Sequence, residues 1–110
     1  MKQETIDRVL KFRDDRDWRQ FHTPKDLALS LTLEAAELLE IFQWSGTDLD
    51  CIGKTARIRE ELADVLSYCI LMADVVGLDL DEILNEKVTR NEQKYPVEKA
   101  RGNAAKYDEL

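Results

Sequence analysis

The sequence lacks a hydrophobic run approaching the roughly 20 residues that a helix needs to span a bilayer. It also lacks a secretory signal, because the opening stretch MKQETIDRVLKFRDDRDW is charged throughout. Cysteine is scarce, with only Cys51 and Cys69, so we expect reduced thiols in a cytoplasmic protein. Histidine is scarcer still: His22 stands alone, and neither cysteine has a partner set for a zinc site.

Positive charge is also in deficit. The net charge of −7 disfavours nucleic-acid duplexes and anionic membranes as partners. No strand pattern, repeat or low-complexity segment is present, so we expect an all-α fold. The 110 residues suit a single domain over 1–110, in which 97–110 form a C-terminal tail. With 44% hydrophobic residues, the chain has more apolar surface than one small bundle buries. We therefore expect a four-helix bundle-type fold completed by a second copy of the chain.

Helix start and stop signals divide the chain into four predicted helices. Thr23 caps a helix that has Pro24 in its first turn, and Asp79 caps a later one. Gly77 and Pro96 end the last two helices. The predicted helices cover residues 3–16, 24–44, about 50–54 to 76, and 80–95.

Two of these helices each carry two acids three residues apart, Glu34 with Glu37 and Glu61 with Asp64. Residues at this spacing lie about 60° apart on one helix face. Both pairs fall inside the apolar stripe of their helix, where unpaired carboxylates are costly. Lysine and arginine are scarce on these faces, so we expect a hard divalent cation such as Mg²⁺ among the four acids. The alternative is that some of these acids simply face solvent.

Four other residues have two interpretations each. Trp18 either plugs the end of the bundle or stacks on a base beside a metal site. His22 precedes a helix and is more often a cap or a loop hydrogen-bonder than a ligand. Lys87 and Asn91, four apart, fall on the inward face of their helix. They either lie at the edge of the core or aim at the phosphate, sugar or base of a nucleotide.

Five stretches in order, across essentially the whole chain, resemble the MazG-like nucleoside triphosphate pyrophosphohydrolases and, within them, the dCTP pyrophosphatase branch. They are RDWRQFH, EAAELLEIFQW, EELADVLSY, NEKVTRNEQKYP and KARGNAAKY. The chain departs from this pattern at Leu33, where many members carry an acid, and at Val9, where some close relatives place a histidine. The second departure leaves the base preference open.

The resemblance implies a helical fold in a tight dimer or dimer of dimers. It implies Mg²⁺, with Mn²⁺ as a substitute, held by Glu34, Glu37, Glu61 and Asp64. It also implies a nucleotide whose base is gripped by aromatic side chains and whose polar parts meet a cation and an amide. The residues implied are Trp18, Trp44, Tyr68, Lys87 and Asn91.

The expected reaction is hydrolysis of a (deoxy)nucleoside triphosphate, dCTP or a modified dCTP, to the monophosphate and pyrophosphate. Attack at the α-phosphorus follows from the products that the family makes, with Glu34 or Glu37 accepting the proton. One alternative is a non-catalytic helical module whose acidic face binds a basic partner. Another is a related pyrophosphohydrolase with a different base preference. A di-iron bundle is disfavoured, because such sites use Glu-x-x-His pairs.

Overall fold

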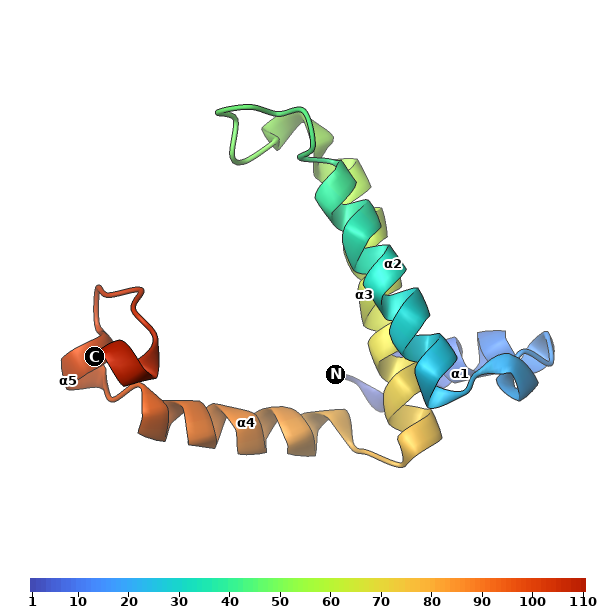
Figure 1. The fold of residues 1–110 in the computed structure, drawn as a ribbon. Helices are drawn as coiled ribbons and strands as arrows, with labels where there is room; N and C mark the ends of the chain where they lie inside the picture. The colour runs from blue at the N-terminus through green and yellow to red at the C-terminus, as the bar shows by residue number, and fades with distance from the viewer. The chain divides into compact units, whose positions relative to one another are not determined.

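The computed structural model describes all residues from 1 to 110, and they form helices and turns without a strand. Two compact units follow each other along the chain, residues 1–77 and 78–110. The all-α prediction is therefore confirmed (Figure 1). No helix has both the length and the apolar character needed to cross a membrane.

The first unit contains α1 (Gln3–Asp15), α2 (Pro24–Glu40) and α3 (Thr55–Val76), with 3₁₀ turns at Arg19–Phe21 and Ile52–Lys54. The second contains α4 (Leu80–Lys94), α5 (Val97–Ala100) and a 3₁₀ turn at Tyr107–Glu109.

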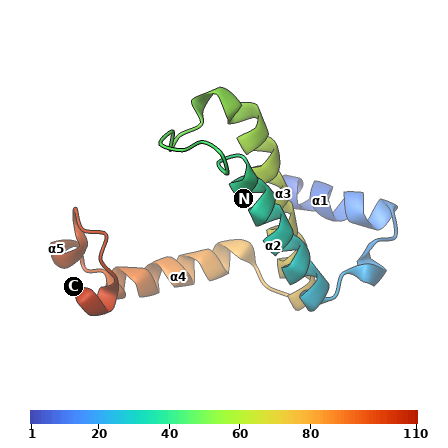
Figure 2. The same ribbon diagram turned by 45° about the horizontal axis from the view of Figure 1, so that its top comes forward.

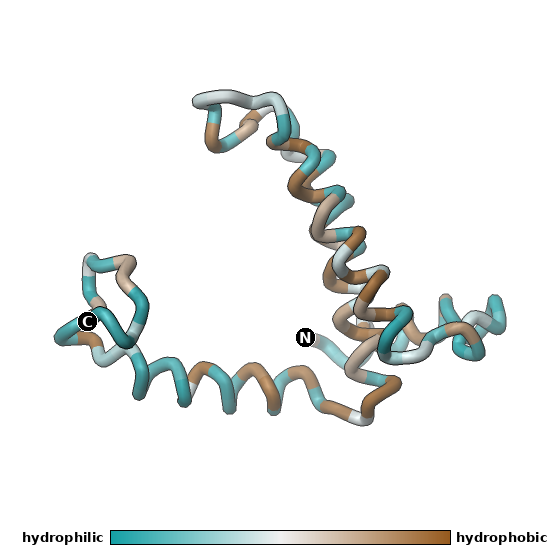
Figure 3. Tube along the Cα trace, viewed as in Figure 1, coloured by the Kyte–Doolittle hydropathy of each residue, from teal (hydrophilic) through white to brown (hydrophobic).

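Helices α2 and α3 form an antiparallel hairpin and lie side by side in both views (Figures 1 and 2). Hydrophobic positions recur along both helices at helical spacing, so that each presents an apolar stripe to the other (Figure 3). The α2 stripe includes Leu27 and continues to Ile41, the residue just after the helix, and these are the two largest side chains that are fully buried. Helix α1 packs against α3. The hairpin is thus the frame of the first unit.

The predicted helix boundaries are confirmed where a capping residue sets them. Thr23 Oγ1 accepts a hydrogen bond from the Asp26 N–H at 3.1 Å, and Pro24 is the first residue of α2. Asp79 Oδ1 accepts from the Glu82 N–H at 2.9 Å at the start of α4. Gly77 ends α3 with φ of 72°, a conformation that favours glycine.

The predicted end of α2 at Trp44 is wrong, because the α-helix ends at Glu40. The N–H groups of Phe42 and Gln43 bond to carbonyls three residues back, at 2.9 and 3.2 Å, and not four. Such bonds tighten the last turn and take the chain out of α-helical register. Trp44 therefore lies in a turn, with 89% of its surface exposed.

The cap at Thr23 gives a stability prediction. Thr23→Ala removes an acceptor from an otherwise unpaired N–H and should lower the free energy of unfolding by about 1 kcal/mol in urea titrations. Thr32→Ala is the matched control, because Thr32 lies inside α2 and bonds only back to the Ala28 carbonyl, at 2.8 Å. Equal losses in the two variants would contradict the capping role.

Candidate metal centre and adjoining cavity

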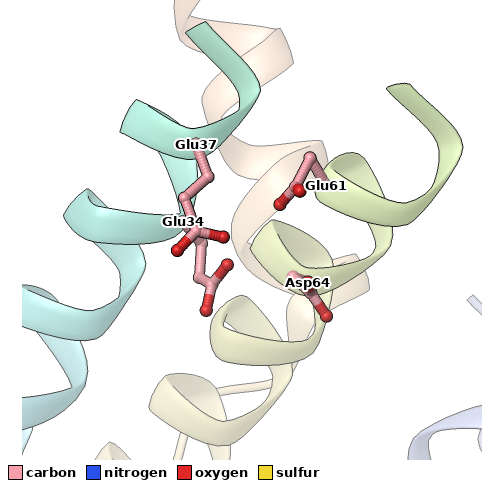
Figure 4. A group of neighbouring side chains, drawn as sticks. All are labelled: Glu34, Glu37, Glu61 and Asp64. Carbon is pink, nitrogen blue, oxygen red and sulfur yellow. The ribbon is translucent and has the colours of Figure 1, made fainter. Parts of the chain in front are cut away.

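All four acids singled out by the sequence meet at one place between α2 and α3. Glu34 and Glu37 come from α2, and Glu61 and Asp64 come from α3 (Figure 4). One oxygen of each carboxylate lies within 4.8 Å of the others. Glu34 and Glu61 are half-buried, whereas Glu37 and Asp64 are exposed. The cluster therefore sits at the rim of the hairpin interface, half in the protein and half open.

The hairpin geometry explains this meeting. Each acid pair is separated by one helical turn, so both members of a pair lie near the same face of their helix. Glu34 lies in the same stripe as the packed side chains of Leu27 and Ile41, and this stripe faces α3. Antiparallel packing then sets the two pairs opposite each other. The same pattern that buries leucines and isoleucines thus draws carboxylates into the interface.

The cluster has no protein cation of its own. No lysine or arginine forms an ion pair with any of the four carboxylates. The Oε2 atoms of Glu34 and Glu61 are buried and lack a hydrogen-bond partner. Burial raises the pKa of both side chains, and the neighbouring Glu37 carboxylate raises each further. Arg57 opposes the shift in the pKa of Glu61, but it ranks last among the causes.

This donor set fits a hard divalent cation. All four ligating groups are carboxylates, which suit Mg²⁺ and Mn²⁺. Zinc sites typically use nitrogen and sulfur ligands instead. A cation among them would provide partners for the two unpaired oxygens and offset the repulsion that raises the pKa of Glu34 and Glu61. The residues therefore fit the metal that the resemblance implies.

A cavity of about 460 Å³ adjoins the cluster and shares two of its acids, Glu34 and Asp64. Its volume lies within the usual range of small-ligand sites. Helix α1 and the segment after it form one wall, and α3 forms another. The first wall includes Val9, Phe12, Arg13, Trp18 and His22, and the second includes Ser67, Tyr68 and Leu71.

The structure brings only part of the predicted ligand set to this cavity. Trp18 and Tyr68 both line it. Trp44 does not line it and lies exposed in the turn after α2. Lys87 and Asn91 lie four residues apart on α4, in the second unit, where both are exposed.

Sequence reasoning missed part of the cavity wall. His22, expected as a cap or loop residue, lines the cavity, and its Nδ1 atom is buried without a hydrogen-bond partner. Burial and the positive charge of Arg13 lower the pKa of His22, so its ring is neutral near pH 7. Arg13 itself was not singled out. His22 ends RDWRQFH, one of the stretches on which the family resemblance rests, so it could have been considered as a site residue. No spacing pattern pointed to Arg13.

Residues 29–110 match the model of the MazG-like family. Mouse and human dCTP pyrophosphatase 1 are 40% and 38% identical to this chain in alignments of 105 residues that cover 91% of it. The chain spans 62% of the length of these curated relatives. A solved structure of a pyrophosphatase from Archaeoglobus fulgidus is 42% identical, with a TM-score of 0.78 over 84% of this chain and 90% of that one.

The raised pKa values predict how metal-free stability depends on pH. An acid whose pKa is higher in the folded state adds stability below its unfolded pKa of about 4.5, and this stability is lost as pH rises through the folded value. Metal-free Glu61→Gln should therefore melt above the wild type at about pH 7.5, and this difference should shrink towards pH 4.5. Adding Mg²⁺ at the higher pH should raise the melting temperature of the wild type but not of Glu61→Gln.

Glu60→Gln is the control for this experiment. Glu60 is the exposed acid next to Glu61 and lies outside the cluster. It should keep the wild-type response to both pH and Mg²⁺. If Glu60→Gln and Glu61→Gln behave alike in thermal melts, the four acids do not form the cation site.

Proposed function

Because the chain belongs to the MazG-like family, we propose that it hydrolyses a nucleoside triphosphate to the monophosphate and pyrophosphate. The observation that carries this proposal is the cluster of four carboxylates opening onto the cavity, with Glu34 and Asp64 common to both. The names of its relatives, dCTP pyrophosphatase 1 and a pyrophosphatase, support the same reaction. We propose dCTP or a modified dCTP as the substrate.

The four acids share one task in this proposal, and some of them have a second. Together they would hold Mg²⁺, or Mn²⁺ in its place, which supplies charge neutralisation at the phosphates and lowers the pKa of a bound water. Glu34 and Asp64 also line the cavity, so they would place the metal next to a ligand bound there. Glu34 or Glu37 accepts the proton of the water that attacks the α-phosphorus.

The remaining proposed contacts orient the nucleotide. Trp18 and Tyr68 both line the cavity, where their rings can contact the base. Lys87 would meet phosphate, and Asn91 would meet phosphate, sugar or base. Trp44 is exposed and free to cover a base. Val9 lines the cavity as an apolar side chain, so base preference depends on the other wall residues.

We also propose that the chain works as a homodimer or homotetramer. Large apolar side chains stay exposed on α1, on both hairpin helices α2 and α3, and on α4. Leu29 and Leu33 share a face of α2, and Leu62 and Leu66 share a face of α3. A second copy would cover such faces.

Both cysteines are free, which fits the proposed cytoplasmic location.

A panel of common ribo- and deoxyribonucleoside triphosphates and 5-methyl-dCTP, assayed with and without Mg²⁺, tests the reaction. We expect pyrophosphate and monophosphate, only with the metal, and fastest from a deoxycytidine nucleotide. Glu37→Gln and Asp64→Asn should each lower kcat by about a hundredfold or more, because each removes a metal-binding carboxylate, while the helical circular dichroism is unchanged.

Glu60→Gln should keep wild-type turnover, because Glu60 lies outside the cluster. Near wild-type rates in both Glu37→Gln and Asp64→Asn would reject the assigned ligands. No turnover of any nucleotide by the wild type would favour the alternative, an acidic module that binds a basic partner. Preference for another base would overturn only the choice of dCTP.

Sedimentation equilibrium tests the assembly. The wild type should have two or four times the chain mass of 12.8 kDa. Replacing both Leu62 and Leu66 with Lys places charge on one exposed face of α3 and should shift the protein towards the monomer mass. A monomeric wild type would contradict this assembly.

A further inference from the structure

Arg13 is the one charged residue that the structure buries, with 2% of it exposed. It lies in the last turn of α1 and lines the cavity beside Phe12 and Trp18. A buried arginine must have its charge and its N–H groups satisfied by partners. Its partners therefore show what this residue holds in place.

The guanidinium of Arg13 binds two carboxylates. Its Nε donates to Asp14 Oδ1 at 2.8 Å, and its Nη1 donates to Asp74 Oδ2 at 2.6 Å. Asp74 belongs to α3 and is 61 positions away in the sequence. Arg19 Nη1, from the turn after α1, lies 3.6 Å from the same Asp74 oxygen. One carboxylate on α3 thus ties down both α1 and the segment that follows it.

The main chain of Arg13 also positions Trp18. The Arg13 carbonyl accepts hydrogen bonds from the N–H groups of Arg16, at 3.2 Å, and Trp18, at 3.1 Å. The Trp18 ring meets the ring of Phe12 edge-on, with centroids 5.8 Å apart. Residues 12, 13 and 18 therefore form one connected wall, and the side chain of Arg13 anchors this wall to α3.

This anchor lies at the far end of the cavity from the acidic cluster. Along α3 the cavity is lined by Asp64, then Ser67 and Tyr68, then Leu71, at intervals of one turn. Asp74 is on the next turn, about 15 Å along the helix axis from Asp64 at the rise of an α-helix. A change at Asp74 can therefore move the Trp18 wall without touching a carboxylate of the cluster.

We propose that the Arg13–Asp74 ion pair is a positioning device for Trp18 that sets how tightly the cavity holds the base end of its ligand. This inference rests on the proposed function, because it assigns the base to the Trp18 end of the cavity and the phosphates to the acidic end. The pair acts through the wall and makes no contact with the reacting atoms. Its loss weakens substrate binding and leaves the hydrolytic step intact.

Steady-state kinetics of Asp74→Asn test the proposal. With saturating Mg²⁺, KM for the preferred nucleoside triphosphate should rise about tenfold, because Trp18 loses its fixed position, while kcat stays within about twofold. Asp15→Asn is the matched control, because it removes an exposed ion pair of the same length, 2.6 Å to Lys11, on α1, the helix that carries Arg13. It should change neither constant. An unchanged KM in folded Asp74→Asn, or a fall in kcat at constant KM, would overturn the proposal.

Arg13→Lys carries the same test if Asp74→Asn fails to fold. A lysine keeps the charge but cannot bind Asp14 and Asp74 with the paired geometry of a guanidinium. Its KM should rise with kcat preserved. Wild-type values for both constants in Arg13→Lys would overturn the proposal, because the paired guanidinium would then have no role in binding.

A spectroscopic measurement separates this inference from the proposed function. The chain has two tryptophans, so Trp44→Phe leaves Trp18 as the only indole fluorophore. In that background and without ligand, Asp74→Asn should shift Trp18 emission to longer wavelength and increase its quenching by acrylamide. Asp15→Asn should do neither. If the wild type turns over no nucleotide but Trp18 responds in this way, the proposed function fails and the anchor stands. If Trp18 does not respond, the anchor fails whatever the enzyme does.

Discussion

Repulsion among four carboxylates held between α2 and α3 is the constraint on which the rest of this site depends. Two of these acids lie half-buried in the stripe that packs the hairpin, and each has an oxygen without a partner. Burial and the neighbouring carboxylates raise the pKa of Glu34 and Glu61, so the charged cluster costs stability near neutral pH. The proposed cation would offset this cost, and two of the acids that would hold it, Glu34 and Asp64, also line the cavity.

The cavity has one charged end and one aromatic end. At one end, Glu34 and Asp64 offer negative charge, which the proposed metal would reverse so that phosphate can bind. Towards the other end, Phe12 and Trp18 present rings that Arg13 and Asp74 hold against α3. A nucleotide has the same division into a polyanion and a flat base. The two ends depend on different interactions, a carboxylate cluster and an ion pair, about 15 Å apart along α3.

Local signals in the sequence predicted the fold well. Thr23, Asp79 and Gly77 set helix ends through hydrogen bonds and backbone conformation within a few residues, and each acts where predicted. Helical spacing also placed Glu34 with Glu37, and Glu61 with Asp64, on the faces that meet. The end of α2 was missed because a 3₁₀ turn replaces its last α-helical turn, and no residue pattern requires that choice. The Arg13–Asp74 pair could not be predicted, because its partners are 61 positions apart and no local rule relates them.

The proposed function requires a divalent cation to bind among the four acids that the hairpin brings together. Anomalous diffraction at the manganese absorption edge, from crystals grown with Mn²⁺, would locate such a cation. We expect a strong peak within bonding distance of carboxylate oxygens of the four acids, which are Glu34, Glu37, Glu61 and Asp64. A map with no peak there, or with manganese bound only elsewhere on the protein, would contradict this expectation.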